Sequence, residues 1–259
     1  MASILDRYGI KEVADVTFYE LNDNGTPGNP VLFLDTLKVS TIEQTASSSD
    51  ARGGKGNAKL ISWDFDKELN VTLEDALFSP KSLSIMFGQK GAVDFTTKTI
   101  TKTMNFIPTN HDKFPGIIKD PTGSGYVFTA AGVTESGTGI TEVTWYDETG
   151  KKIEDYSTVN PDEGKRYMCT FKVSATAVKT IAVDAAHFPG TYYIVGDTYA
   201  RNDATGKDEF FQFVIYKAKV SPENTITLQA DGDPSTFSMN LTVLRNPEGK
   251  MMDLIQYTV

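Results

Sequence analysis

The chain has 259 residues, of which 39% are hydrophobic and 23% are charged, and this composition excludes general disorder. The formal net charge of −9 argues against a protein that grips DNA through a basic face. No apolar run reaches the roughly 18 residues of a membrane-spanning helix, and the charged N-terminus lacks the apolar core of a signal peptide, so we expect synthesis in a cytoplasm.

The first strands are predicted close to the N-terminus. Residues 1–12 are expected to form a loosely held arm, and Asp15–Leu21 alternates apolar and polar side chains as a strand does. The run from Asn22 to Pro30 is dense in turn residues and predicts a hairpin turn or a longer loop. Val31–Thr45 then returns as one long strand or two short ones.

A Ser- and Gly-rich segment follows these strands. Ala46–Ala58 (ASSSDARGGKGNA) has no large apolar residue to pack into a core, so it is expected to be a mobile excursion. The strands resume over Lys59–Phe65 and Lys67–Leu73, which predicts a protrusion from the sheet. The glycines do not form a phosphate-binding loop, because Lys55 is followed by Gly56 and a strand instead of Ser or Thr and a helix.

The one predicted helix lies between Ser79 and Gly88. Ser79 is placed to cap its N-terminus, Pro80 suits its first turn, and Gly88 suits the position just past its end. An apolar stripe is formed by Leu83, Met86 and Phe87. This short amphipathic helix is expected to cover one end or side of the sheet.

Residues 108–178 differ in character from their surroundings. They follow a Thr-rich strand at Phe95–Phe106, and Gly-rich loops alternate in them with short strands that carry their own aromatic residues, Thr141–Tyr146 and Arg166–Val173. We therefore expect three segments: the first half of a main domain at 1–107, an inserted β-module at 108–178, and the second half of the main domain at 179–259.

The main sheet is predicted to resume at Thr180. Strands are expected at Thr180–Ala185 and Thr191–Ala200, and the last strand at Lys250–Val259. Between them, Asp208–Leu244 holds three alternating runs separated by two turns, which predicts an antiparallel meander with one packed face. The runs are Phe211–Tyr216, Ile226–Ala230 and Phe237–Val243. The fold class predicted from the sequence is all-β with one short helix.

Candidate residues for chemistry are few. His111 and His187 stand in loops with no Cys or His at metal-ligand spacing. Cys169 lies in an alternating strand and is interpreted as a small buried residue. The run Asp231–Asp233 lacks the glutamate that closes a calcium loop, and no G-x-S-x-G elbow is present. We therefore predict no enzyme activity and no catalytic, cofactor or metal site.

Two long segments carry a family resemblance. The first is ARGGKGNAKLISWDFDKELNVTLEDALFSPKSLSIMFG, and the second runs from FPGTYYIVGDTYARNDATGKDEFFQFVIYKAKV through ADGDPSTFSMNLTVLRN to MMDLIQY. Together they resemble tailed-bacteriophage major tail tube proteins, the phage major structural protein family, over Val13–Phe106 and Thr180–Tyr257. The resemblance implies a β-barrel or sandwich tail-tube fold flanked by the helix, with the inserted β-module as a decoration of the tube exterior.

The resemblance also implies how such a protein works. Six copies would form a ring, and rings would stack into a tube that conducts the genome into the bacterial host. The arm residues expected to contact the next ring are Asp50, Arg52, Gly53, Gly54, Lys55 and Gly56. The helix residues expected to flank the barrel are Pro80, Leu83, Met86 and Phe87.

The implied partners are further copies of the chain and other virion components. These are a tape measure protein in the lumen, a tail terminator, baseplate or tail-tip proteins and, where the tail has one, a sheath. Double-stranded DNA would pass as cargo without specific binding, since an acidic wall repels phosphates. The protein would reside in the virion tail after synthesis in the host cytoplasm, and no membrane is implied.

The alternative hypothesis is a β-sandwich adhesin or carbohydrate-binding module of a virion or cell surface. Its candidate sugar platform is Trp145 or Tyr146, and only one of them can serve a given surface, because adjacent strand residues point to opposite faces. The competing interpretation makes one of them a core aromatic of the inserted module.

Overall fold

The computed structural model describes residues 7–89, 93–106, 117–119, 125–129, 132–135, 140–154, 165–226 and 236–258. The chain divides into two compact units, the first made of Met1–Ala92 and Ile181–Val259, the second of Val93–Thr180. The second unit therefore begins at Val93 and not at residue 108, because the strand that starts there pairs along its length with the strand that ends at Thr180.

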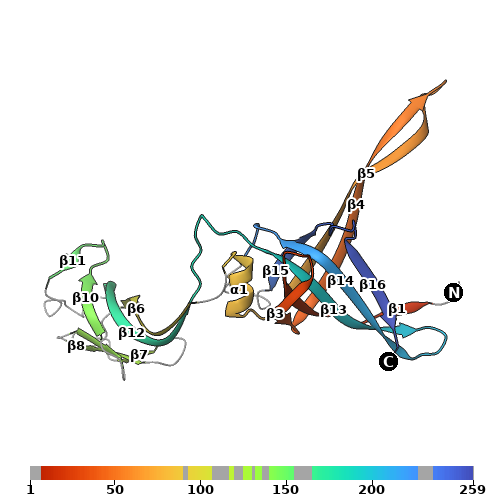
Figure 1. The fold of residues 1–259 in the computed structure, drawn as a ribbon. Helices are drawn as coiled ribbons and strands as arrows, with labels where there is room; N and C mark the ends of the chain where they lie inside the picture. The colour runs from red at the N-terminus through yellow and green to blue at the C-terminus, as the bar shows by residue number, and fades with distance from the viewer. Residues whose placement is uncertain are drawn as a thin grey trace. The chain divides into compact units, whose positions relative to one another are not determined.

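Strands make up most of both units (Figure 1). Unit 1 contains β1 (Tyr8–Ile10), β2 (Asp15–Leu21), β3 (Pro27–Leu34), β4 (Leu37–Gly53), β5 (Ala58–Asp75), α1 (Pro80–Met86), β13 (Thr191–Asn202), β14 (Asp208–Val220), β15 (Phe237–Val243) and β16 (Met252–Tyr257). Unit 2 contains β6 (Val93–Phe106), β7 (Ile117–Lys119), β8 (Gly125–Thr129), β9 (Gly132–Glu135), β10 (Ile140–Tyr146), β11 (Lys152–Ile153) and β12 (Tyr167–Thr180). The predicted all-β fold class is confirmed.

Unit 1 is one antiparallel sheet that curves around a single core. The strand order is β3-β2-β13-β14-β15-β5-β4, with β1 paired to β13 and β16 paired to β14. Strands near both ends of this order contribute to the same apolar cluster, so the sheet folds over itself in the manner of a sandwich. Its largest fully buried side chains include Phe18, Leu73, Ile194, Ile215 and Leu241. Burying each such side chain stabilises the fold by about 1.5–3 kcal/mol.

A glycine makes room for an aromatic ring in the middle of this sheet. Gly196 on β13 lies directly opposite Phe213 on β14. A Cβ atom added to Gly196 would lie 2.1 Å from the Cζ atom of that ring. The ring thus occupies the space that any other residue at position 196 would need.

Helix α1 closes onto the core of unit 1. The Ser79 hydroxyl accepts a hydrogen bond from the Ser82 amide at 3.0 Å, and the Ser82 hydroxyl accepts one from the Ser79 amide at 2.9 Å, which completes a capping box. Gly88 follows the helix with a φ of +74°, a conformation that favours glycine. The helix and both of its ends are therefore confirmed.

The apolar face of α1 differs from the predicted stripe in two residues, Ile85 and Phe87, and Phe87 is the half-buried C-cap residue. Met86 is buried as expected, and Ile85, which the stripe left out, is equally buried at 2% exposure. Leu83 packs against the core from a partly buried position. The carbonyl oxygen of Met86 accepts a hydrogen bond from the Asn224 amide group at 2.6 Å, which satisfies one of the open acceptors at the helix end.

The C-terminal meander predicted from the sequence is wrong. β14 pairs directly and antiparallel with β15 through Ala218–Val220, whereas the first and third strands of a meander are parallel and separated by the second. The other part of the same edge of β14, Phe210–Ile215, pairs with β16. Of the predicted middle run, Ile226 lies in no strand and Thr227–Ala230 lie outside the described residues.

Three smaller predictions also differ from the structure. Tyr8–Ile10 forms β1 instead of a loose arm, because it pairs with the end of β13. Pro27–Pro30, predicted as loop, already belongs to β3 and faces β2. Ile181–Ala185, predicted as strand, is irregular, because β12 ends at Thr180.

Unit 2 has a core of its own. Its four-stranded sheet has the order β11-β10-β12-β6, and β7, β8 and β9 form a separate three-stranded sheet. The buried face of β12 carries Tyr167, Cys169, Phe171 and Val173. Cys169 is fully buried, as the sequence predicted, and this burial raises the pKa of its thiol to about 12.

Candidate assembly surface

The outer parts of β4 and β5 leave the packed body as a two-stranded ribbon (Figure 1). We call residues 46–67 the arm. Its cross-strand pairing runs from Ser47 opposite Phe65 to Gly53 opposite Ala58. The predicted mobile excursion is therefore wrong over Ala46–Gly53, because inter-strand backbone hydrogen bonds order these short side chains without any core.

A bulge marks the point where the arm leaves the body. Thr45 lies opposite Glu68 and Ser47 lies opposite Phe65, so two residues of β5 face the single residue Ala46 on β4. One of these two, Asp66, has a φ of +50°. An extra residue in one strand shifts its alternation by one position. Side chains of β5 beyond the bulge therefore change faces relative to those before it.

The bulge divides the apolar residues of β5 between two surfaces. Before it, Leu69, Val71 and Leu73 point into the core and are at most 7% exposed. After it, Phe65, Trp63 and Ile61 lie on the opposite face of the ribbon and are 48%, 55% and 54% exposed. Their cross-strand neighbours on β4 are small, namely Ser47, Ser49 and Ala51. We call these six residues the apolar face of the arm.

The other face of the arm is polar and paired within itself. The Asp50 carboxylate accepts hydrogen bonds from Lys59 Nζ at 2.8 Å, Ser62 Oγ at 2.8 Å and Arg52 Nη2 at 3.2 Å. These contacts, with Lys59 first, lower the pKa of Asp50 below its ordinary value. The ribbon is thus amphipathic, with ion pairs on one face and large apolar side chains on the other.

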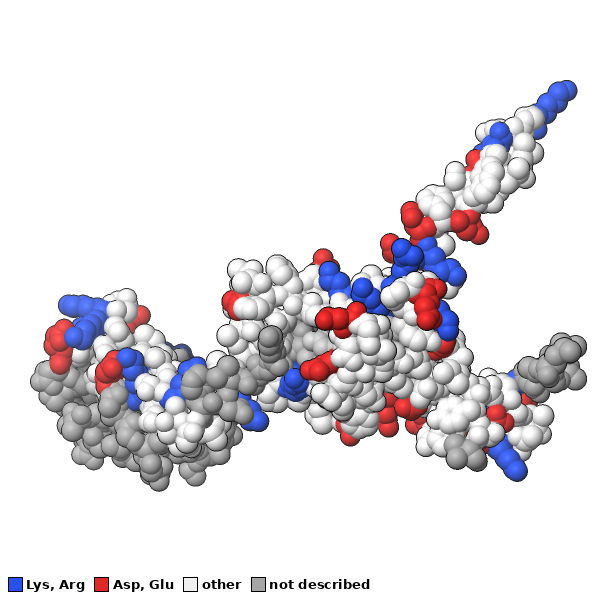
Figure 2. Space-filling view, viewed as in Figure 1, with Lys and Arg blue, Asp and Glu red and all other residues white. Residues whose placement is uncertain are grey.

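The arm ends in a tight turn that carries positive charge. Gly54, Gly56 and Asn57 adopt φ angles of +78°, +85° and +50°, which glycine and asparagine tolerate. Lys55 stands between the two glycines, and Figure 2 shows basic side chains at the tip of the arm. Close to the tip, three basic residues face one acidic residue: Arg52, Lys55 and Lys59 against Asp50.

The residues predicted to make the inter-ring contact are thus brought together at one end of the arm. Asp50, Arg52 and Gly53 close β4, and Gly54, Lys55 and Gly56 form the turn. Sequence reasoning missed the apolar face beside them. Its signal was the alternation of Ile61, Trp63 and Phe65, which is also the pattern of an ordinary buried strand.

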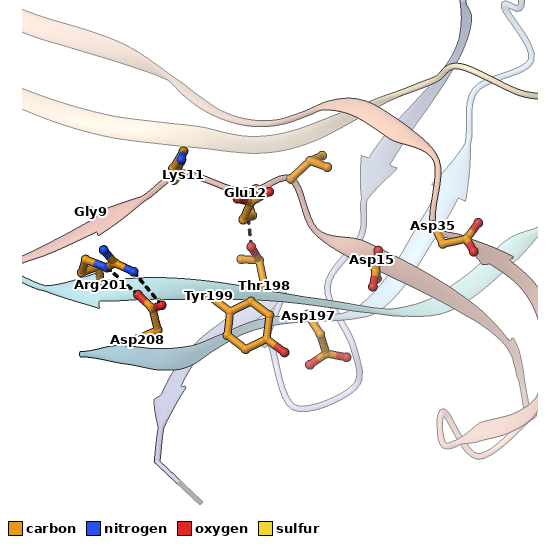
Figure 3. Close-up of a pocket in the computed structure, with 11 residues that line it drawn as sticks. Gly9, Lys11, Glu12, Asp15, Asp35, Asp197, Thr198, Tyr199, Arg201 and Asp208 are labelled. Atoms are coloured by element: carbon orange, nitrogen blue, oxygen red, sulfur yellow. Dashed lines mark hydrogen bonds and ion pairs between the residues drawn. The ribbon is translucent and has the colours of Figure 1, made fainter. Parts of the chain in front are cut away.

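Unit 1 also holds an acidic cleft, which is lined by residues of β1, β2, β13 and β14 and of the segments beside them (Figure 3). The cleft has a volume of about 690 Å³, and its acidic lining residues are Glu12, Asp15, Asp35, Asp197 and Asp208. Asp208 is neutralised, because both of its oxygens accept hydrogen bonds from the Arg201 guanidinium at 2.7 and 2.8 Å. Asp15 and Asp197 are cross-strand partners, an arrangement of like charges that is unfavourable without a nearby cation.

A second hollow lies beside the acidic cleft, and we call it the apolar hollow after three large side chains that line it, next to the polar Thr36, Asp75, Ser79 and Ser82. Its volume is about 250 Å³, and it shares Asp35 with the cleft. Three of its lining side chains are large, apolar and exposed: Phe33 at 58%, Leu77 at 64% and Phe78 at 56%. The Phe78 ring is held against Phe237 with 4.7 Å between ring centroids. Exposed apolar side chains gathered around a hollow are typical of a docking surface.

The histidines and the Asp231–Asp233 run were the other candidate residues. His187 is exposed and bonded to Asp184 through Nδ1 at 2.8 Å, and this contact, together with hydrogen bonds from the Ala186 amide and the Gln89 side chain, lowers the pKa of Asp184 to about 2. His111 and Asp231–Asp233 lie outside the described residues. Within the described part of the chain, no three His, Cys, Asp or Glu side chains come close enough to hold a metal ion.

The sugar platform of the alternative hypothesis is also weakened. Trp145 is only 9% exposed and lies opposite Cys169 in the core of unit 2, and Tyr146 is half-buried. Trp145 is therefore a core aromatic residue of its unit, beside Tyr167 and Phe171. Among the described residues, no helix has the length and apolar character needed to cross a membrane.

Comparison with known proteins gives a match over nearly the whole chain. The model of the YomU/Tube protein family matches residues 8–256. The tail tube protein of Bacillus phage SPR is 25% identical to the chain over 233 residues, which are 86% of this chain and 78% of that protein. The family match includes the arm, the helix and unit 2.

Proposed function

The chain belongs to the YomU/Tube protein family and is a structural protein of a phage tail tube, and we propose that six copies form a ring and that stacked rings form the conduit for genome delivery. The observation that carries this proposal is the arm. It holds Trp63 and Phe65 about half exposed on a ribbon that projects from a well-packed body. A two-stranded ribbon with an uncovered apolar face is marginal in water, so a further copy of the chain is the natural cover.

The edges of the sheet support assembly into a closed ring. In the described strand order, β3 and β4 are the two ends. A strand edge presents unpaired amide and carbonyl groups and is a hazard for a monomer. In a ring, the β3 edge of one copy can pair with the β4 edge of the next, which removes the hazard and uses the same joint at every interface.

A polar face of unit 1 supports the channel role. On the paired parts of β4, β5 and β15, the alternating side chains that point away from the core are polar or acidic: Thr41, Glu43, Asn70, Thr72, Glu74, Ser238, Asn240 and Thr242. Thr72 donates a hydrogen bond to Asn240 across two of these strands at 3.1 Å. A surface of hydroxyls, amides and carboxylates stays hydrated and does not attract DNA phosphates.

The arm and the helix take different parts in the proposed assembly. The tip residues, Asp50, Arg52, Gly53, Gly54, Lys55 and Gly56, contact the adjacent ring. The helix flanks the sheet through Pro80, Leu83, Met86 and Phe87, and two of these already pack on or in the core. Unit 2, which has its own buried core, decorates the tube exterior.

The proposed partners follow from the tube. They are further copies of the chain, a tape measure protein in the lumen, a tail terminator, baseplate or tail-tip proteins and a sheath where the tail has one. Double-stranded DNA passes without specific binding. The protein acts in the virion tail after synthesis in the host cytoplasm.

Electron microscopy of the purified protein tests this proposal. At rising protein concentration, negative-stain images should show rings or hollow tubes with a regular axial repeat, and sedimentation velocity should show the loss of monomer. A strict monomer at every concentration, together with glycan binding by the full chain that is lost on Tyr146→Ala, would overturn the proposal in favour of a carbohydrate-binding module.

A further inference from the structure

The arm and the apolar hollow lie at opposite ends of the same two strands. β4 and β5 pair from Leu37 opposite Asp75 at one end to Gly53 opposite Ala58 at the other. The apolar hollow with Phe33, Leu77 and Phe78 belongs to the first end, where β3 leads into β4 and β5 leads into α1. A strand of 17 residues separates this end from the tip by roughly 55 Å.

The two ends are complementary in chemistry and in order. Along the arm, the apolar face comes first and the basic tip follows. At the other end of the body, the apolar hollow adjoins the acidic cleft, and Asp35 lines both. An arm laid with its apolar face in the hollow would therefore bring its basic tip toward the carboxylates.

The charges of the acidic cleft have no sufficient cation of their own. Arg201 is engaged with Asp208, which leaves Glu12, Asp15, Asp35 and Asp197 facing Lys11 among the residues that line the cleft. Asp15 and Asp197 stand directly opposite each other on paired strands. A basic tip placed over these two carboxylates would relieve their repulsion, whereas a second acidic surface would increase it.

We propose that the arm of one copy docks on the apolar hollow and the acidic cleft of the axially adjacent copy. The apolar face of the arm, with Ile61, Trp63 and Phe65, packs into the hollow formed by Phe33, Leu77 and Phe78. The tip residues Arg52 and Lys55 lie over the carboxylates of the cleft. This inference rests on the proposed tube function and adds to it the face of the arm that is used and the surface that receives it.

The geometry explains why such a contact builds a filament. The donating arm and the receiving surface are different parts of the unit, so each docked copy leaves one of each open. A heterologous contact of this kind does not close on itself and propagates along one direction. Pairing between the β3 and β4 edges would then join copies around a ring, and the arm contact would join copies along the axis of the tube.

Site-specific cross-linking tests the proposal on the full chain. The variant Ser49→Cys/Leu77→Cys places one thiol on the apolar face of the arm and one at the hollow. A short bismaleimide should link assembled copies into a ladder of covalent oligomers. The natural Cys169 does not interfere, because it is fully buried and its raised pKa keeps the thiol protonated.

A neighbouring position supplies the matched control. Ser48 precedes Ser49 but lies on the polar face of the ribbon, opposite Asp64. The variant Ser48→Cys/Leu77→Cys should assemble equally and give at least tenfold less cross-linked product. Equal ladders from both variants, or tubes of the Ser49→Cys/Leu77→Cys variant without any ladder, would overturn the docking proposal and leave the tube function standing. If neither tubes nor ladders form, the proposed function and the docking proposal fail together.

Charge reversal gives an independent readout. The variants Arg52→Glu/Lys55→Glu and Glu12→Lys/Asp35→Lys should each raise the protein concentration needed for tube formation at least tenfold. An equimolar mixture should recover part of the loss, because each altered tip meets a cleft of opposite charge where the two variants alternate, and all four substitutions in one chain should recover most of it. If the chain with all four substitutions needed a protein concentration raised by the combined effect of the two double variants, the tip and the cleft would not meet, and the proposal would be overturned.

Discussion

The two halves of β5 are built from the same kinds of residues and behave in opposite ways. The inner half carries Leu69, Val71 and Leu73, which are buried in the core of unit 1. The outer half carries Phe65, Trp63 and Ile61, which are about half exposed on the arm. The apolar residues recur at every second position in both halves, so their pattern does not separate the two environments.

What separates them is one bulge between the two halves. It turns the apolar side chains of the outer half to the other face of the ribbon, where unit 1 offers no cover. The inner half therefore serves folding and the outer half remains for association. The following predictions test this division, and they run from the largest expected effect on stability to the smallest.

The first prediction compares one core residue with one arm residue. Leu73→Ala should lower the free energy of unfolding of the monomer by about 2–5 kcal/mol, because it leaves a cavity at a residue that is 1% exposed. Trp63→Ala should change it by less than about 0.5 kcal/mol and should abolish tube formation. Urea denaturation of freshly isolated monomer gives both numbers. A comparable loss in the two variants would mean that Trp63 packs within its own chain.

The second prediction concerns the glycine under the Phe213 ring. Gly196→Ala should lower the free energy of unfolding by about 1–3 kcal/mol, because the new Cβ atom collides with the ring. Gly9→Ala is the matched control, since a Cβ atom there meets no atom within 4 Å. Thermal and urea unfolding should separate the two variants clearly. Equal stability would show that the body tolerates repacking at this point.

The third prediction removes the bulge. A serine inserted after Ala46 would give each strand two residues between the Thr45–Glu68 pair and the Ser47–Phe65 pair. The arm would keep its pairing but turn its apolar face to the other side. The stability of the monomer should change by no more than about 1 kcal/mol, while tube formation should be lost.

A substitution at the bulge provides the control for this insertion. Asp66→Gly keeps the extra residue and suits the positive φ at this position. This variant should assemble as the unaltered chain does. Normal tubes from the insertion variant would contradict the role of the bulge, and electron microscopy distinguishes the outcomes.

The smallest expected effect concerns the ion pairs near the tip. Because the pKa of Asp50 is lowered from 3.8, its contacts with Lys59, Ser62 and Arg52 are formed at neutral pH and are lost as the pH falls through the lowered value. Lys59→Met should raise the pKa of Asp50 toward 3.8, and Lys55→Met should not. A carboxyl carbon NMR titration measures both. If the pKa of Asp50 were the same in both variants, Lys59 would not be the main cause of its lowered pKa.

The sequence predicted those features that short local signals encode. Ser79, Pro80 and Gly88 mark the helix ends because capping and positive φ depend on neighbouring residues alone. The alternation of apolar and polar side chains was sufficient to predict the strands at Asp15–Leu21 and Thr191–Ala200, because it too depends on neighbouring residues alone. The all-β fold class followed from such segments.

Other features depend on pairing between distant segments and could not be predicted. Ala46–Gly53 is ordered by backbone pairing with β5, and the small side chains of this segment give no sign of that pairing in the sequence. The bulge follows from the relative register of two strands. The acidic cleft assembles Glu12, Asp35 and Asp197 from segments far apart in the chain, and only the strand order brings them together.

The most direct test of the arm is its removal without disturbing the body. Thr45 and Glu68 are cross-strand partners, so replacing residues 46–67 by Asn-Gly should close the shortened hairpin with a two-residue turn. This variant should unfold at the same urea concentration as the full chain. In electron micrographs it should form no stacked tubes under conditions where the full chain does. Tubes with the axial repeat of the full chain would contradict the account.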